Sequence, residues 1–139
     1  MRKLGIDYGD ARVGISLTDP LNITVQGLET IQRNGSDKVV LRHLDEILDK
    51  YEIDTIVVGM PLNLKGEKTV RAEITEQFVH KLKCKYNKIK IVTVDERLTT
   101  VAAHKTMNFL GIDKNKKHNI VDTISAVYIL ETYINSENK

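Results

Sequence analysis

Three acidic residues stand at places in the sequence where a freely solvated charge is unexpected. Asp7 ends a short apolar run and is followed by Tyr8-Gly9, whereas Glu96 closes a β-branched run that begins at Ile89. Asp122 lies in a segment that is apolar nearly all round when it is drawn as a helix. A carboxylate in such surroundings must be paired, must cap a helix or must hold a cation.

These acids suggest a particular chemistry if the first strand, the last strand and the last helix meet at one edge of a sheet. Asp7, Glu96 and Asp122 would then repel one another unless a divalent cation neutralised them. Carboxylate oxygens suit Mg²⁺ or Mn²⁺, and no Cys/His cluster is present to favour Zn²⁺. Paired ions about 4 Å apart can activate water and stabilise the leaving oxyanion of a phosphodiester.

Each acid also has a purely structural interpretation, and the residues by themselves leave it open. Asp122 could be a first-turn acid that the helix dipole favours. Asp7 could cap the turn at Gly9, and Glu96 could pair with Arg97 or with a lysine.

The elements that must position the acids follow from the hydrophobic periodicity. Strands are predicted at 3–7, 13–17 and 23–31, and their short connections favour an antiparallel meander. Helices and strands then alternate: helix 36–51, strand 55–59, helix 67–83, strand 89–94, helix 99–111, a lysine-rich loop and helix 120–133. This order predicts an α/β fold in which a mixed five-stranded sheet, three antiparallel strands and then parallel strands, is flanked by helices.

Composition narrows the class of protein. With 139 residues, of which 41% are hydrophobic and 29% charged, one domain spanning 1–139 is expected. The net charge of +2 does not indicate nucleic acid by itself. The single cysteine, Cys84, excludes an intramolecular disulfide, and the apolar runs are too short to cross a membrane. Asp7 comes too early for a signal peptide, so a cytoplasmic protein without membrane attachment is expected.

Four motifs, in order along the whole chain, resemble those of one known family. They are Asp7-Tyr8-Gly9 with Arg12 and Gly14, Val58 to Asn63 with Gly66, Asp95 to Thr100, and Val121-Asp122 with Ser125-Ala126. The resemblance is to the YqgF/RuvX family of pre-16S rRNA nucleases, formerly described as Holliday junction resolvases. It implies an RNase H-like fold, Asp7, Glu96 and Asp122 as the metal-binding catalytic carboxylates, and processing of the 5′ end of pre-16S rRNA during ribosome biogenesis.

One departure bears on the substrate. Resolvases of the same superfamily carry two acids one turn apart on the last helix, but here Asn119, preceded by His118, stands three residues before Asp122. An amide oxygen can coordinate Mg²⁺ but brings no charge. A nuclease is therefore favoured over a junction resolvase, and whether Asn119 or His118 replaces a fourth acidic ligand stays open.

Candidate nucleic-acid contacts surround the acids. They are Arg12, Arg97, Thr99, Thr100, Lys116, Lys117 and His118. The arginines could instead form ion pairs, the threonines could cap a helix, and the lysines could form a solvated face, while His118 could also shuttle a proton. Structured RNA, including ribosome precursors, is the favoured partner, branched DNA is the alternative, and the oligomeric state is not predicted.

Two other functions compete with the nuclease. A non-catalytic nucleic-acid adaptor could keep the acids for structure, and a metal-dependent cleavage test separates it from an enzyme. Sugar-kinase/actin-type ATPases share the D-x-G opening, but they need two such domains and several hundred residues, which 139 residues cannot supply.

Overall fold

The computed structural model describes residues 1–62, 65, 67–95 and 114–137, and for 114–122 it describes the course of the helix but not the side chains. The described elements are β1 (Arg2–Tyr8), β2 (Arg12–Thr18), β3 (Val25–Gln32), α1 (Asp37–Lys50), β4 (Ile53–Met60), α2 (Val70–Lys85), β5 (Lys90–Asp95) and α4 (Lys114–Glu137). The helix predicted at 99–111 lies outside the described residues.

The five strands form one mixed sheet in the order β3-β2-β1-β4-β5. The β1–β2 and β2–β3 pairs are antiparallel, whereas the β1–β4 and β4–β5 pairs are parallel. Short turns allow the first three strands to pair antiparallel, and the parallel strands are reached through the helical crossovers α1 and α2. The predicted mixed sheet is confirmed, with β1 at its centre.

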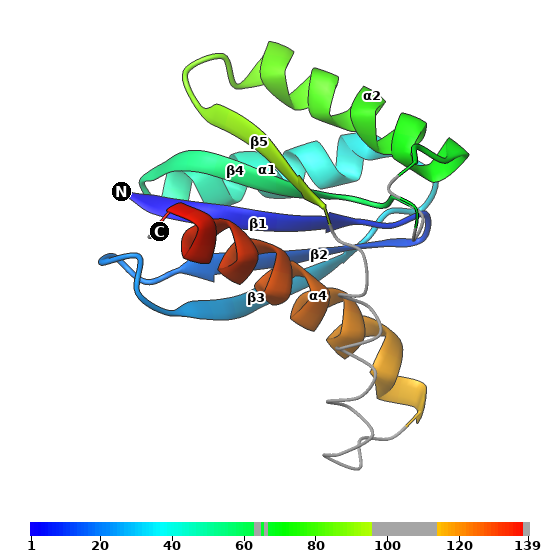
Figure 1. Cartoon of the computed structure of the whole chain (residues 1–139), viewed down its shortest axis with the longest axis horizontal. Coiled ribbons are helices and arrows are strands. Elements are labelled where there is room, and N and C mark those ends of the chain that lie inside the picture. Colours follow the sequence, from blue (N-terminus) through cyan, green and yellow to red (C-terminus); the bar gives the residue numbers. More distant parts are fainter. Residues whose placement is uncertain (63–64, 66, 96–113, 138–139) are drawn as a thin grey trace.

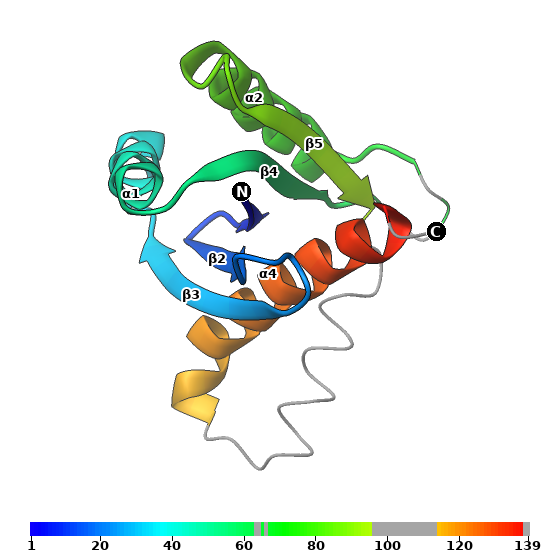
Figure 2. The ribbon, with the colours of Figure 1, turned by 90° about the vertical axis from the view of Figure 1, so that its left-hand side faces the viewer.

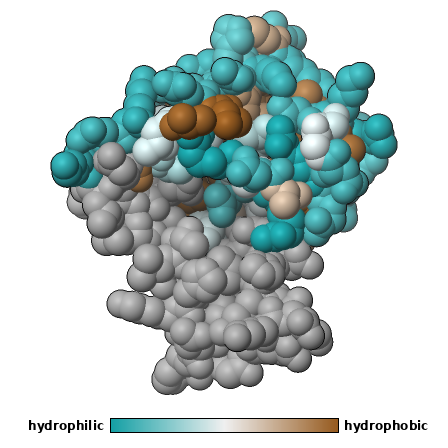
Figure 3. Space-filling model, turned by 90° about the vertical axis from the view of Figure 1, so that its right-hand side faces the viewer, coloured by the Kyte–Doolittle hydropathy of each residue, from teal (hydrophilic) through white to brown (hydrophobic). Residues whose placement is uncertain are grey.

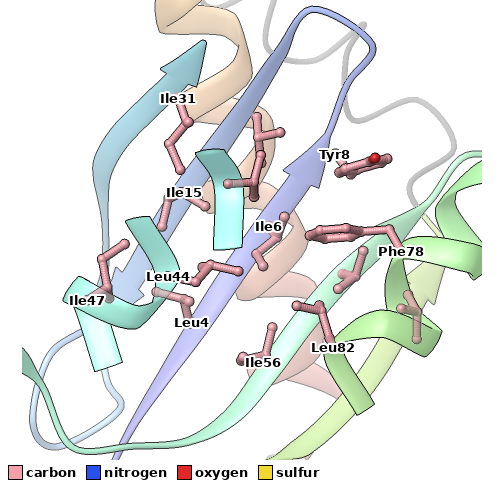
Figure 4. Close-up of a cluster of buried hydrophobic side chains, with 14 of the residues drawn as sticks. Leu4, Ile6, Tyr8, Ile15, Ile31, Leu44, Ile47, Ile56, Phe78 and Leu82 are labelled. Atoms are coloured by element: carbon pink, nitrogen blue, oxygen red, sulfur yellow. The ribbon is translucent and has the colours of Figure 1, made fainter. Parts of the chain in front are cut away.

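Helices cover both faces of the sheet. Figure 2 shows α1 and α2 on one face and α4 crossing the other. On the first face, Ile6, Leu44 and Phe78 belong to one buried cluster, which Figure 4 shows in close-up. On the second face, Val57 and Leu130 belong to another buried cluster. Strand β4 is buried on both faces, as its uninterrupted β-branched run predicts.

Local capping sets the starts of α1 and α2. Ser36, the predicted cap of α1, has an extended backbone and accepts a hydrogen bond from the Lys38 amide at 3.1 Å. Helix α2 begins at Val70 rather than near residue 67, because Thr69 is its cap and accepts a hydrogen bond from the Ala72 amide at 3.2 Å. The expected start was therefore about one turn early.

Helix α4 differs from the expectation at its N-terminal end. The lysine-rich loop expected before residue 120 is wrong, because α4 already includes Lys114. Residues 114–119 contain no proline or glycine, and lysine is a good helix former, so nothing stops the helix there. Asp122 thus lies about two turns into α4, beyond the reach of the helix dipole, which excludes the first-turn explanation for this acid. No helix in the described part of the chain, α4 included, has the length and apolarity that a membrane crossing requires.

Candidate active site

The first candidate residue, Asp7, lies near the end of the central strand and faces α4. Ile6 and Tyr8 point into the core beneath α1 and α2. Gly5 points the other way, because a Cβ atom placed there would lie 2.9 Å from the carbonyl oxygen of Ala126 on α4. Successive side chains of a strand alternate between faces, so Asp7 is on the α4 face with Gly5. Its side chain is half-buried.

Glycines flank Asp7 on both neighbouring strands. Gly14 of β2 is its antiparallel pairing partner. On the other side Ile6 pairs with Val58 of β4, so that Gly59 is the residue of β4 next to Asp7. Neither neighbour has a side chain, so the two adjoining strands place no side chain directly beside Asp7 on the α4 face. Its place beside Asp7 is a structural reason for glycine at position 14 of the sequence motif.

The same row of the sheet leads to the position of Asp122. Gly14 pairs with Thr30 of β3, and the hydroxyl oxygens of Thr30 and Thr123 of α4 lie 2.7 Å apart in a hydrogen bond. Asp122 is the residue before Thr123, so the backbone of α4 at this point lies on the same face of the sheet as Asp7, over β3. The side chain of Asp122 lies outside the described part of the structure, and its place beside Asp7 stays a prediction.

The third candidate, Glu96, follows β5 directly in the sequence. Met60 at the end of β4 pairs with Asp95, and because β1, β4 and β5 are parallel, their carboxyl ends share one edge of the sheet (Figure 1). Val94 of β5 packs against the α4-side cluster. Glu96 itself lies outside the described residues, as do Arg97, Thr99 and Thr100, and their predicted roles stay predictions.

The turn between β1 and β2 explains a second glycine of the motif. The Gly9 amide donates a hydrogen bond to the Arg12 carbonyl oxygen at 3.0 Å. A Cβ atom at Gly9 would collide with that same oxygen, so a tight turn here requires glycine. The turn sets Arg12, which is half-buried, at the start of β2 and on the end of the sheet that carries Asp7.

A charged cluster around Tyr8, the residue after Asp7, was not predicted from the sequence. It lies on the side of the sheet that α1 and α2 cover, whereas Asp7 is on the α4 face. The carboxylate of Asp37 accepts hydrogen bonds from the Tyr8 hydroxyl, from Arg33 Nε at 2.9 Å and from Lys81 Nζ at 2.7 Å. Burial of Asp37 raises its pKa, but the hydrogen bonds from Lys81, Tyr8 and Arg33 outweigh it, so that the pKa lies below its ordinary value. Burial, and then the bond to Asp37, raise the pKa of Tyr8. Arg33 and Asp37 are only four residues apart, but Tyr8 and Lys81 reach Asp37 through the packing of α1 and α2 on the sheet, and no sequence motif joins them.

The predicted basic residues near the site lie on α4. Lys116, Lys117 and His118 occupy the first turns of the helix, and Figures 1 and 2 show this end of α4 projecting beyond the sheet. The described surface on the side where the parallel strands end is mainly hydrophilic and has one larger hydrophobic area (Figure 3).

Comparison with known proteins identifies the family of this chain. Residues 1–136 match the RuvX family, described as Holliday junction resolvase. The chain belongs to the RuvX family. A relative from Ruminiclostridium cellulolyticum, named "Putative pre-16S rRNA nuclease", is 49% identical over 134 residues, which are 96% of this chain and 94% of the relative.

Solved structures support the fold. The fowlpox virus Holliday junction resolvase matches with a TM-score of 0.59 and 12% identity over 99% of both chains. Thermus thermophilus RuvC, solved in complex with a Holliday junction substrate, matches with a TM-score of 0.57 and 13% identity over 99% of this chain and 96% of the other. At this identity the likeness concerns the fold alone, and it confirms that this RuvX-family chain has an RNase H-like fold.

The predicted donors, three carboxylates, are of a type that suits a divalent cation. Within the residues that the structure describes, no three His, Cys, Asp or Glu side chains gather closely enough to hold a metal ion. That region contains the side chain of only one predicted ligand, Asp7. Its hard carboxylate oxygens and the glycines beside it suit Mg²⁺ or Mn²⁺.

Proposed function

We propose that this protein is a divalent-metal-dependent nuclease that hydrolyses phosphodiester bonds in processing the 5′ end of pre-16S rRNA. The observation that carries the proposal is the position of Asp7. It lies at the end of the central strand, between Gly14 and Gly59, on the face of the sheet that α4 covers. A carboxylate at the carboxyl end of a central parallel strand is well placed to hold a divalent ion for a ligand that binds at this edge of the sheet.

Asp7, Glu96 and Asp122 would hold Mg²⁺ or Mn²⁺. The bound ions would supply a water of lowered pKa and a charge that stabilises the leaving oxyanion. The paired backbone of β1 fixes the position of Asp7 in the sheet. Arg12 begins β2 beside the same edge, and its guanidinium suits a phosphate oxygen of the substrate.

The substrate class rests on the name of the relative and on charge. The Ruminiclostridium relative is named for pre-16S rRNA, and full-length similarity at 49% identity supports the same substrate here. Lys116, Lys117 and His118 lie on the projecting end of α4, where they would meet a strand that extends past the acids. A protein that processes ribosome precursors would act in the cytoplasm.

Junction resolution is the second candidate, favoured by the family description and by the RuvC-like fold. It requires two active sites on a symmetric dimer. Asn119, where a second acid of α4 would stand, weakens this candidate, because an amide brings no charge to the site.

A three-substrate assay tests the proposal. Purified protein with Mn²⁺ is given a pre-16S rRNA fragment, a four-way DNA junction and a single-stranded RNA, with EDTA as the control. We expect metal-dependent cleavage of the rRNA precursor and its loss in Asp7→Asn. Preferred cleavage of the junction would support the resolvase, and binding without cleavage of any substrate would support an adaptor.

Asp122→Asn separates a catalytic from a structural acid. If the three carboxylates repel one another without metal, removing one charge should leave stability in EDTA unchanged or raise it while cleavage is lost. A structural Asp122 would instead cost about 1–3 kcal/mol through a lost charged hydrogen bond. Urea melts in EDTA, paired with the cleavage assay, decide between these outcomes. Lower stability with cleavage retained would contradict the site assignment.

A further inference from the structure

The turn between β1 and β2, which follows Asp7, receives hydrogen bonds from residues that lie outside the turn. Within the turn, the Arg12 carbonyl accepts a hydrogen bond from the Gly9 amide. The Asp10 carbonyl accepts from Arg33 Nη1 at 3.0 Å, and the Ala11 carbonyl accepts from the Arg33 amide at 2.9 Å. Asp10 and Ala11 are exposed to solvent, and these two hydrogen bonds tie their backbone to Arg33.

The remaining contacts come from Arg71 in the first turn of α2. Its Nη2 donates to the carbonyl oxygen of Tyr8, and its Nη1 donates to Asp10 Oδ1 at 2.5 Å. The guanidinium carbon also lies 5.7 Å from the centre of the Tyr8 ring. That ring stacks on Phe78, also of α2, at 4.0 Å between centroids (Figure 4). The Arg71 guanidinium thus bonds both to Tyr8, the residue after Asp7, and to Asp10 in the middle of the turn.

The start of α2 is also bonded to Pro61, in the segment that follows β4. Thr69 caps the helix and donates a hydrogen bond through its hydroxyl to the carbonyl oxygen of Pro61 at 3.2 Å. Pro61 belongs to the second family motif and follows β4, the strand next to Asp7. The start of α2 therefore contacts both motifs: Thr69 bonds to Pro61 of the second motif, and Arg71 bonds to Tyr8 of the first.

We propose that Arg71 is a positioning residue that sets the backbone at Tyr8 and thereby the orientation of the Asp7 carboxylate and of Arg12. The inference rests on the proposed function for its catalytic consequence but not for its structural one. A planar fork can satisfy the Tyr8 carbonyl and the Asp10 carboxylate at once, which a lysine ammonium on its flexible stem does less well.

Three variants isolate this role. Arg71→Met keeps much of the apolar stem but removes both donors. Arg71→Lys keeps the charge but loses the fork. Lys68→Met is the matched control, because Lys68 precedes the same helix and its ammonium lies 2.7 Å from Glu76, without a role in the turn.

The first readout does not depend on catalysis. Amide hydrogen exchange at Gly9 and at Arg33, whose N–H groups close the turn, should become at least about tenfold faster in Arg71→Met and remain unchanged in Lys68→Met, since 1.4 kcal/mol of local opening corresponds to tenfold. Amides in the middle of β4 should exchange as in the wild type, which shows that the fold is kept.

The second readout concerns the site. Removing a group that orients a metal ligand typically weakens metal affinity or activity by about 10- to 100-fold. We expect a loss of this size in Mn²⁺ affinity and in kcat for Arg71→Met, with KM for the RNA changed less than about threefold and a smaller loss in Arg71→Lys. Lys68→Met should match the wild type.

Each outcome has a distinct meaning. Unchanged exchange at Gly9 and unchanged Mn²⁺ affinity in Arg71→Met would overturn the inference. A raised KM with kcat unchanged would also overturn it, because it would assign Arg71 to substrate binding. If the wild type cleaves none of the three substrates, the proposed function fails, whereas hydrogen exchange and metal titration still decide the role of Arg71.

Discussion

Replacing Gly5 by alanine should lift α4 from the sheet. Gly5 lies in the central strand, two residues before Asp7, and α4 crosses directly over it. An added Cβ would lie 2.9 Å from the Ala126 carbonyl oxygen and 2.9 Å from Leu130 Cβ, and closer still to the hydroxyl of Ser16. Two of these neighbours belong to the helix that carries Asp122, so the helix or the strand must shift.

The cost of Gly5→Ala follows from three contributions. Overpacking a filled core costs about 1–3 kcal/mol. The buried hydroxyl of Ser16 donates to the Ala126 carbonyl at 2.7 Å, and losing this bond with both groups still buried costs about 1–3 kcal/mol. Alanine recovers about 0.5–1 kcal/mol because glycine is unfavourable within a strand. The net loss of unfolding free energy is about 3 kcal/mol.

Urea melts of Gly5→Ala measure this loss, and a midpoint lowered by about 1–2 M is expected for a domain of this size. Gly35→Ala is the control, since Gly35 has φ of +73° and no atom within 4 Å of an added Cβ. It should lose about 1–2 kcal/mol through backbone strain alone. At a temperature where both variants are folded, only Gly5→Ala should lose cleavage. A stability change below about 0.5 kcal/mol, or cleavage equal to that of the control, would refute the reasoning.

Two further predictions concern charge. Asp37→Asn should lower stability at pH 7 by about 1–3 kcal/mol, because it weakens the bonds that Asp37 accepts from Tyr8, Arg33 and Lys81. The low pKa of Asp37 in the folded state means that its contribution is present above pH about 4 and is lost as the pH falls further, so melts at pH 7 and pH 3 should show the difference from the wild type narrowing. The double variant K116A/K117A should bind RNA more weakly and with a flatter salt dependence, because fewer counterions are released, and titrations at several salt concentrations would show an unchanged slope if these lysines are only a solvated face.

Much of the sheet could be read from local patterns. The β-branched run of β4 marks a strand that is buried on both sides, because an uninterrupted apolar run has no face for solvent. The alternation in β2 marked a strand correctly, although β2 is also buried on both faces because α4 covers its small and polar residues. Ser36 was found as a helix cap because capping is a contact between near neighbours in the chain. Asp7 was also singled out from a local pattern, because it is an acid at the end of an apolar strand.

Contacts between distant residues were decided only by the tertiary structure. Nothing local distinguishes Arg71 from other surface arginines, and its contact with Asp10 spans 61 positions. The glycines beside Asp7 acquire their meaning from register, since Gly14 and Gly59 become its neighbours only when three strands pair. The start of α4 was misjudged because a polar, lysine-rich stretch is compatible with either a loop or a helix.

The sequence by itself determined the order of the described strands and helices and singled out three acids as candidate ligands, because residue type and periodicity are local properties of the chain. The tertiary structure decided which residues lie beside Asp7 and which residue bonds to the backbone that follows it. Strand register places the two glycines beside it, and the packing of α2 against the sheet brings Arg71 to the turn that follows it. Such contacts depend on the crossing of whole elements, and no spacing of residues along the chain encodes that crossing.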